Sequence, residues 1–134
     1  MTTLDLYAYA QKNDVAVYDF HLEGRKALSV PLEDGVCAVA MDTLRMSSKD
    51  EKLALAHELG HCMTHTFYNE KTPCVTRSRC ETRAMKWAVK HLVDEGKLRR
   101  AIRAGMQVWE IAELFEVDEL TIEQAVNLYF YNHI

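Results

Sequence analysis

The sequence has few of the residues that interrupt or staple a chain. Its 134 residues include two prolines and five glycines, whereas 49% are hydrophobic and 27% are charged. This composition is ordinary for a folded domain and excludes a largely disordered chain. At this length one domain can bury a hydrophobic core without disulfide bridges.

Long hydrophobic runs are also missing. No apolar stretch approaches the ~20 residues that a membrane-spanning helix needs, and residues 1–7 lack the basic start and apolar centre of a signal peptide. These absences predict a cytoplasmic protein that does not enter a membrane. In that compartment the cysteines are expected to be thiols, and they form no C-x-x-C pair that would favour a zinc ribbon. They are Cys37, Cys62, Cys74 and Cys80.

The C-terminal part lacks positive charge. The net charge of the chain is -4, and from Met106 onward there is no lysine or arginine. A DNA-binding segment of this charge would be repelled by phosphates, so we expect no direct contact with nucleic acid. Its apolar side chains, such as Trp109 and Leu114, are expected to pack into the core or to dock a partner protein. Basic side chains gather instead at residues 77–103, where a solvated helix surface is the simplest interpretation.

What the sequence does contain is a succession of strands followed by helices. A short helix is expected over residues 3–12, and β-branched and aromatic runs predict strands at 15–20, 26–31 and 36–41. The Asp-Gly pair between the last two strands favours a hairpin. We therefore expect a small antiparallel sheet of about three strands in an α+β fold.

Helical patterns fill the rest of the chain. The first is expected to begin at an N-cap Ser48, with Glu51 at the capping-box position. The predicted helices span residues 46–66, 79–94, 98–104, 108–115 and 120–131, with a loop at 69–78, and the last two helices resemble a helix-turn-helix. We expect a single domain over residues 1–134, with a core at 1–104 and a helical C-terminal segment at 105–134 that packs on the core or extends it.

The stretch 57–61 reads H-E-L-G-H and lies within the longest of these helical patterns. His57 and His61 stand four residues apart, so on a helix both imidazoles face the same side and can bind one metal ion. Glu58 lies beside them, where a carboxylate can accept a proton from an attacking water. Because five letters also occur by chance, two ordinary helical histidines remain the alternative.

A zinc site of this kind needs a third protein ligand. His65 would lie ~12 Å from His57 along a helix axis, too far for the two to share one ion. Glu81 lies on the next predicted helix, and Ala84 and Ala88 follow it on the same face, where small side chains would allow close packing. The spacing fits equally well a carboxylate that opposes the dipole at a helix N-terminus.

Residues 81–88 read E-T-R-A-M-K-W-A. Together with the H-E-L-G-H stretch they resemble the ImmA/IrrE family of zinc metallo-endopeptidases, which shows H-E-L-G-H and then a helix of the form E-x-x-A-x-x-[FW]-A. The likeness covers roughly residues 15–92, although the apolar L-L-x-P that often follows is H-L-V-D here. It implies a zincin-like core and a gluzincin-like hydrolase with one Zn2+ ion. The implied ligands are His57, His61 and Glu81, and the implied catalytic base is Glu58.

The resemblance also implies a substrate. Members of the family are regulators that cleave a partner helix-turn-helix repressor, so we expect a repressor as the protein substrate. The chain looks like a minimal phage- or mobile-element-type member without a separate DNA-binding domain. The alternative is a non-catalytic, metal-containing anti-repressor that binds such a regulator. A structural zinc site at His61, Cys62, Cys74 and Cys80 is a third interpretation, disfavoured because adjacent helical residues point in different directions.

Two further roles would complete a peptidase site. A hydrogen-bond donor is needed for the tetrahedral oxyanion, and the candidates are His65, Tyr68 and His91. An extended substrate can pair with an exposed edge of a sheet, and we assign that edge to the strand at 36–41.

Overall fold

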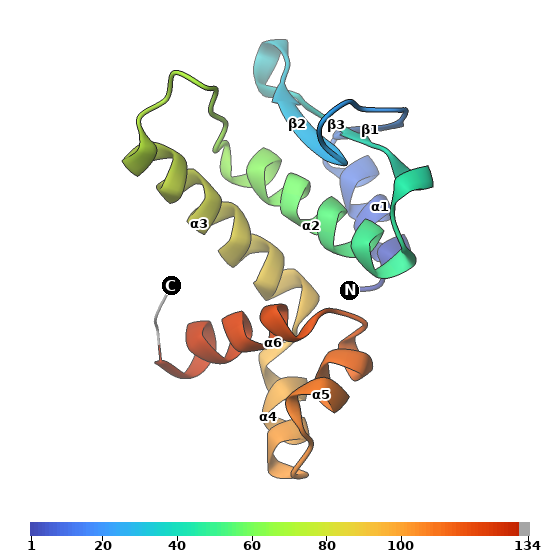
Figure 1. The fold of residues 1–134 in the computed structure, drawn as a ribbon, viewed down its shortest axis with the longest axis vertical. Helices are drawn as coiled ribbons and strands as arrows, with labels where there is room; N and C mark the ends of the chain where they lie inside the picture. Colours follow the sequence, from blue (N-terminus) through green and yellow to red (C-terminus); the bar gives the residue numbers. More distant parts are fainter. Residues whose placement is uncertain (132–134) are drawn as a thin grey trace.

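Three short strands form a mixed sheet near the N-terminus of the fold. The computed structural model describes residues 1–131, and its sheet has the strand order β1-β3-β2 (Figure 1). The strands are β1 (Ala16–Asp19), β2 (Ala27–Pro31) and β3 (Cys37–Met41). β2 is antiparallel to β3, as the hairpin signal predicts, whereas β1 is parallel to β3. The fold is α+β as expected, but the expectation of a wholly antiparallel sheet is wrong.

The connection between β1 and β2 explains the parallel pair. Asp19 at the end of β1 and Ala27 at the start of β2 both pair with Met41 at the end of β3. The chain therefore crosses over the end of β3 between β1 and β2, and β3 later inserts between them. β3 is the central strand and all of its residues are buried, so our assignment of the substrate-pairing edge to this strand is wrong. β2 and β1 are the edges, and Pro31 ends an edge strand, where a missing N–H is tolerated.

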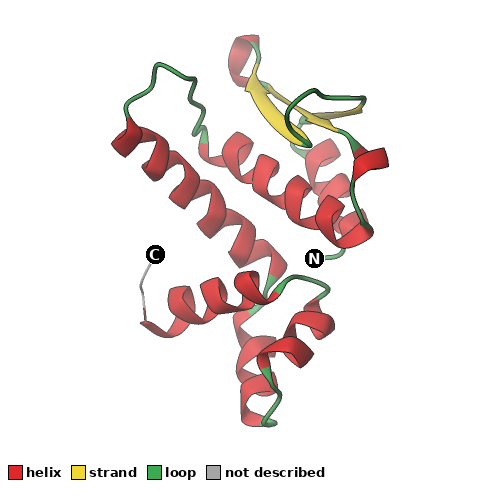
Figure 2. Ribbon diagram, viewed as in Figure 1, coloured by secondary structure: helices red, strands yellow, loops and turns green. Residues whose placement is uncertain are grey.

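Helices make up most of the remaining chain (Figure 2). They are α1 (Thr3–Lys12), α2 (Ser48–Thr64), α3 (Cys74–Leu92), α4 (Glu95–Arg103), α5 (Val108–Phe115) and α6 (Glu119–Val126), followed by a π-helical turn η3 (Asn127–Tyr131). Short 3-10 turns, η1 (Glu33–Gly35) and η2 (Thr43–Arg45), flank β3. None of the helices in the described part of the chain has the length and hydropathy to span a membrane.

Two helix starts differ from the predicted ones. The N-cap of α2 is Ser47 rather than Ser48, and its hydroxyl accepts a hydrogen bond from the backbone N–H of Asp50. α3 begins at Cys74, inside the predicted loop, because Pro73 supplies the N-cap carbonyl that receives the N–H of Arg77. Proline costs nothing at a helix start, where its missing N–H would have no helical partner.

α2 lies at the centre of the fold. It packs against α1 and the sheet on one side and against α3 on the other, and α2 and α3 run in opposite directions (Figure 1). A Cβ atom at Gly60 would collide with the carbonyl oxygen of Ala84, so only glycine allows this approach of the two helices. Ala84 and Ala88 are buried in the same contact. This confirms the close packing predicted along the alanine face of α3.

The C-terminal helices pack against the ends of α2 and α3 that lie lower in Figure 1. α6 packs on α3, and the buried Lys52 of α2 donates a hydrogen bond from Nζ to the carbonyl oxygen of Phe115 at the end of α5 (2.6 Å). Ile111 is buried, but Trp109 and Leu114 are 56% and 58% exposed. The prediction that these two side chains pack into the core is therefore wrong.

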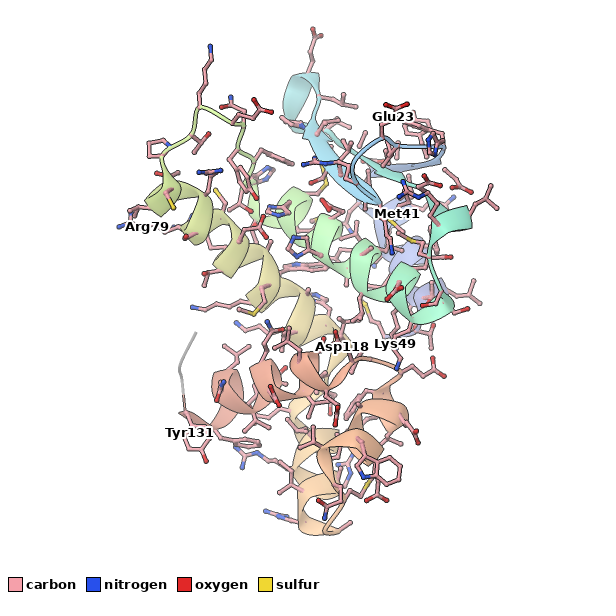
Figure 3. The ribbon with its side chains drawn as sticks, in the orientation of Figure 1. Glu23, Met41, Lys49, Arg79, Asp118 and Tyr131 are labelled. Carbon is pink, nitrogen blue, oxygen red and sulfur yellow. A yellow bond between two sulfur atoms is a disulfide. The ribbon has the colours of Figure 1, made fainter. Side chains whose placement is uncertain are left out.

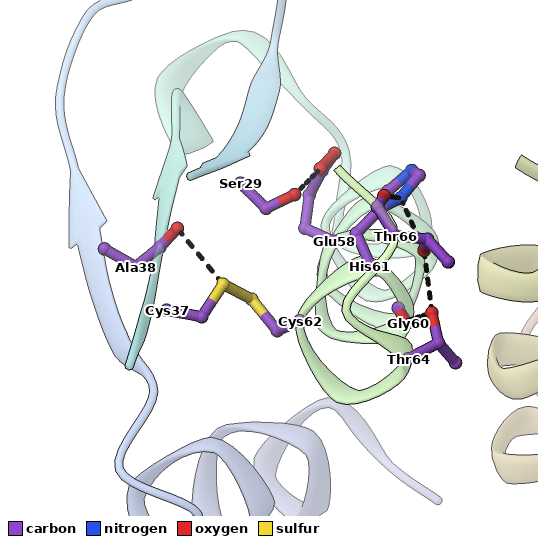
Figure 4. Close-up of a disulfide and its surroundings, with 9 residues drawn as sticks. All are labelled: Ser29, Cys37, Ala38, Glu58, Gly60, His61, Cys62, Thr64 and Thr66. Atoms are coloured by element: carbon purple, nitrogen blue, oxygen red, sulfur yellow. Dashed lines mark hydrogen bonds between the residues drawn. A yellow bond between two sulfur atoms is a disulfide. The ribbon is translucent and has the colours of Figure 1, made fainter. Parts of the chain in front are cut away.

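A disulfide joins the sheet to α2. Cys37 of β3 and Cys62 of α2 are bonded, with their Cα atoms 5.7 Å apart (Figure 4). The expectation of thiols is wrong for this pair, because both side chains point into the contact between the two layers and are buried there. Cys74 and Cys80 are not bonded to each other or to this pair. The interpretation of a structural zinc site that uses Cys62 is therefore also wrong.

Candidate metal centre

The central helix presents the two histidines of the H-E-L-G-H stretch side by side. Residues 49–56 are good helix formers, and the cap at Ser47 satisfies the first turn. The helix therefore continues through His57 and His61, whose four-residue spacing places them on one face. Their Nε2 atoms are 3.2 Å apart.

α3 brings a carboxylate to the same point. The two oxygens of Glu81 lie 3.0 Å from Nε2 of His57 and 3.1 Å from Nε2 of His61. α3 begins at Cys74, so Glu81 stands two turns inside the helix and far from its N-terminus. The dipole explanation for this carboxylate fails, because that effect is confined to the first turn.

The spacing of these atoms fits a tetrahedral metal ion. Zinc bonds to nitrogen and oxygen are about 2.0–2.1 Å long, so two ligands of a tetrahedron lie about 3.3 Å apart. The separations of 3.0–3.2 Å, in which each histidine faces a different oxygen of Glu81, are close to that edge. With one ligand atom from each residue, the three atoms lie within 4.8 Å of one another.

The proton on His61 strengthens the case for a cation. Its Nδ1 donates a hydrogen bond to the carbonyl oxygen of Thr66 (2.6 Å), which can only accept. In the neutral form of the imidazole that makes this bond, the Nε2 lone pair faces the Glu81 carboxylate, and a cation bound between the two acceptors would remove their repulsion. A carbonyl that orients the distal nitrogen is the usual support for a metal-binding histidine.

Glu58 lies next to this cluster and has a separate partner. Its side chain is buried, and its Oε1 accepts a hydrogen bond from the hydroxyl of Ser29 on β2 (2.9 Å; Figure 4). Sequence reasoning missed Ser29. The contact joins residues 29 positions apart, and it depends on how β2 lies on α2, for which the sequence carries no local signal.

The sequence profile of a peptidase family described as the IrrE N-terminal-like domain matches residues 44–127. This is well over half of the chain and includes all of α2 to α6. The chain belongs to the IrrE N-terminal-like peptidase family. Comparisons with curated proteins and with solved structures found no match.

Within this peptidase fold, the three candidates for the oxyanion donor lie in different places. The hydroxyl of Tyr68 donates a hydrogen bond to Oε1 of Glu81 (2.6 Å). His65 is the C-cap of α2, with a left-handed backbone (φ 55°), and is exposed. The ring of His91 stacks on Trp87 at a centroid distance of 3.8 Å, more than two turns along α3 from Glu81. The structure brings only Tyr68 of the three to the cluster.

Hydrogen bonding between Tyr68 and Glu81 affects the acidity of both. Partial burial would raise the pKa of Glu81, but the bond from Tyr68 and the neighbouring His57 and His61 lower it below its ordinary value. The bond to Glu81, helped by desolvation, raises the pKa of Tyr68 to about 12. At neutral pH the site therefore contains a carboxylate ligand and a neutral phenol donor.

The cluster lies in a cleft between α2, α3 and the edge strand β2. This polar cleft has a volume of about 280 Å³. Residues of β2 and the preceding turn form one wall, and the segment after α2 forms the end. The polar cleft is lined by Arg25, Ala27, Leu28, Ser29, His57, Glu58, His61, Thr66, Phe67, Tyr68 and Glu81. The exposed edge of β2 is thus the strand edge that faces the cluster, which corrects the assignment to β3.

Proposed function

We propose that the protein is a zinc-dependent endopeptidase of the gluzincin type. The observation that carries this proposal is a buried Glu58, held by Ser29, beside three converging donors from His57, His61 and Glu81. A purely structural metal site has no use for a fourth, separately oriented carboxylate in the same cleft. Membership of a peptidase family supports the same reaction.

Each residue has a defined task in the proposed reaction. His57, His61 and Glu81 would hold a zinc ion, and the chemistry that it would supply there is that of a Lewis acid for the scissile carbonyl and for the attacking water. Glu58 accepts the proton of the attacking water and passes it to the leaving amine. On substrate binding the phenol of Tyr68 would turn its single O–H from Glu81 to the oxygen that becomes negative.

The exposed edge of β2 provides a place for the peptide backbone. β2 pairs with β3 on one side, and its other side opens onto the polar cleft. An extended peptide that adds to this edge would place its carbonyls along the cleft. From the family resemblance we propose that the substrate is a helix-turn-helix repressor.

The test compares the wild-type protein with Glu58→Gln. Each zinc-loaded protein is incubated with the helix-turn-helix repressor encoded beside its gene, and the fragments are identified by mass spectrometry. We expect the wild type to cut the repressor, a chelator to stop the cut, and Glu58→Gln to bind zinc normally without cutting. Glu113→Gln, which changes an exposed carboxylate on α5, should behave as the wild type.

The same experiment identifies the alternative function. If the zinc-loaded wild type forms a stable complex with the repressor and leaves it intact, the protein is an anti-repressor and the peptidase proposal fails. The zinc content of each variant shows whether a variant that does not cut has lost its metal or has lost only its cleavage activity.

A further inference from the structure

A second groove continues from the polar cleft along α2 and α3. This apolar groove has a volume of about 620 Å³. His57, Glu58 and Glu81 line both cavities, so the two form one path that passes the cluster. The apolar groove therefore adjoins the point at which a peptide bond would be cut.

The walls of the apolar groove come from three helices. α2 contributes Leu53 and Ala54, α3 contributes Met85 and Val89, and α6 contributes Leu120. Most side chains beyond the cluster are apolar, while Lys26 and Asp118 are the charged ones among them. Asp118 is the N-cap of α6 and lies where α6 starts, near the end of α2 that carries Lys49 (Figure 3).

Leu120 is unusual in this wall. Its side chain is 59% exposed although it belongs to an amphipathic helix whose other apolar residues, such as Ile122 and Ala125, are buried. An exposed leucine beside other half-exposed apolar groups forms a surface that gains free energy when another apolar group covers it. Because the apolar groove is continuous with the cluster, the group that covers this surface would belong to a bound substrate.

We propose that the apolar groove receives a large apolar side chain of the substrate, and that Leu120 sets its size limit. This inference rests on the proposed peptidase function and names the residue class that the enzyme selects. The C-terminal helices then form part of the substrate site.

The direction of β2 determines which substrate residue faces the groove. Within β2, Ala27 at the start lines both cavities, whereas Leu28 and Ser29 further along line the polar cleft alone. A peptide pairs most stably with the edge when it runs antiparallel. It then runs from the polar cleft towards the apolar groove, and the residue after the scissile bond enters the groove.

The first measurement is a cleavage profile. A library of peptides from a digested proteome is treated with the zinc-loaded protein, and the new termini are sequenced by mass spectrometry. We expect cleavage before leucine, methionine and phenylalanine to be at least about tenfold more frequent than before glycine or alanine, as for other apolar pockets. Leu120→Trp should shift the profile to small residues. Leu114→Trp, which changes a leucine of equal exposure outside the groove, should not.

The second measurement needs no turnover. Binding of two succinyl hydroxamates to the zinc-loaded protein is measured by calorimetry, one with an isobutyl group next to the zinc-binding end and one with hydrogen there. We expect the isobutyl compound to bind at least about tenfold more tightly, and Leu120→Trp to remove the difference while Leu114→Trp keeps it.

The outcomes separate the two proposals. Equal affinity for the two hydroxamates, or a flat profile at the residue after the cut, overturns the role of the groove and leaves the peptidase assignment standing. A protein that takes up no zinc, or whose cleavage persists in chelator and in Glu58→Gln, overturns both.

Discussion

Two proposed metal ligands and the proposed catalytic base are held in place by hydrogen bonds with neighbouring groups. Thr66 fixes the tautomer of His61 through its backbone carbonyl, and Ser29 fixes the carboxylate of Glu58 through its hydroxyl. Tyr68 binds the third donor, Glu81. Each support comes from a segment outside the helix that carries its partner or from that helix's end, so the orientation of the cluster depends on the loop after α2 and on β2.

Ser29→Ala is expected to lower kcat by about ten- to a hundredfold with little change in KM. Without the hydroxyl, Glu58 loses the donor that orients it towards the water, and small misplacements of a catalytic group cost rate of this order. Steady-state kinetics on a cleaved peptide measure both constants. Ser29→Thr keeps the hydroxyl and should restore much of kcat, and Ser78→Ala, an exposed serine on α3, should have no effect. A rise in KM alone would show that Ser29 binds substrate instead.

The site residues that the sequence could predict are those related by helical spacing. His57 and His61 follow directly from a four-residue interval, and the resemblance added Glu81, which α3 brings to them. The catalytic role of Glu58 stays a prediction. Ser29 could not be predicted, since its contact with Glu58 is set by the packing of a strand on a helix and leaves no periodic trace in the sequence.

The contact between α2 and α3 decides where Glu81 lies. Gly60→Ala is expected to reduce the free energy of unfolding by about 1–3 kcal/mol, the usual cost of overpacking, although alanine favours a helix by ~1 kcal/mol. The new methyl group would collide with the carbonyl of Ala84, so the helices must separate and zinc affinity should fall as well. Urea denaturation and competition with a chromophoric chelator measure the two effects.

Gly96→Ala is the matched control. A Cβ atom there would lie 3.3 Å from a side-chain oxygen of Asp94 and would meet no backbone. We expect unchanged zinc affinity and no loss of stability comparable to that of Gly60→Ala. If both alanine variants are equally stable, backbone contact at Gly60 does not limit the approach of the helices.

The end of β1 is joined to the turn before α2 by Asp19. Its carboxylate accepts hydrogen bonds from the hydroxyl (2.6 Å) and the N–H (3.1 Å) of Thr43, and these bonds lower the pKa of Asp19. A lowered pKa in the folded state means that the contribution to stability is complete above the unfolded-state pKa, about 3.9. It is lost as the pH falls from there through the lower folded-state value.

Asp19→Asn should therefore lower the free energy of unfolding at pH 7, and the difference from the wild type should shrink below about pH 4. Urea denaturation across this pH range measures it. Asp14→Asn changes an exposed carboxylate after α1 and should show a smaller, flatter difference. A gap between Asp19→Asn and the wild type that widens in acid would contradict the assignment of the hydrogen bonds.

The order of elements was predictable, but the neighbours of each strand were not. Alternation and turn residues located β1, β2 and β3 to within a few residues. The sequence does not encode that residues 20–26 cross the end of β3, so the parallel pair and the central place of β3 were missed. The early start of α3 was missed because Pro73 was interpreted as a loop residue, whereas it caps the helix.

α2 connects the parts of the molecule that are far apart in sequence. It contacts α1, β2, β3 and α3, and Lys52 near its start reaches α5. Burial lowers the pKa of Lys52, while Glu116 opposes the shift. The division into a core at 1–104 and an attached segment at 105–134 stays a prediction, and the apolar groove gives that segment a proposed task.

Removal of the disulfide by the double change Cys37→Ala and Cys62→Ala is expected to lower the free energy of unfolding by about 3 kcal/mol. The cysteines are 25 residues apart, and closing a loop of this length restricts the unfolded chain by about that amount. Urea denaturation without reductant measures the loss, and Cys74→Ala, an exposed cysteine outside the pair, is the control. A wild type whose stability is the same with and without reductant would contradict it.

The disulfide between Cys37 and Cys62 closes a covalent ring that contains His57 and His61. A protease that nicks the exposed turn before α2 would cut the backbone once inside this ring, and the two pieces would stay joined through sulfur. On a gel without reductant the nicked protein would still run as one band. Self-digestion at that turn would thus pass unnoticed until the sample is reduced.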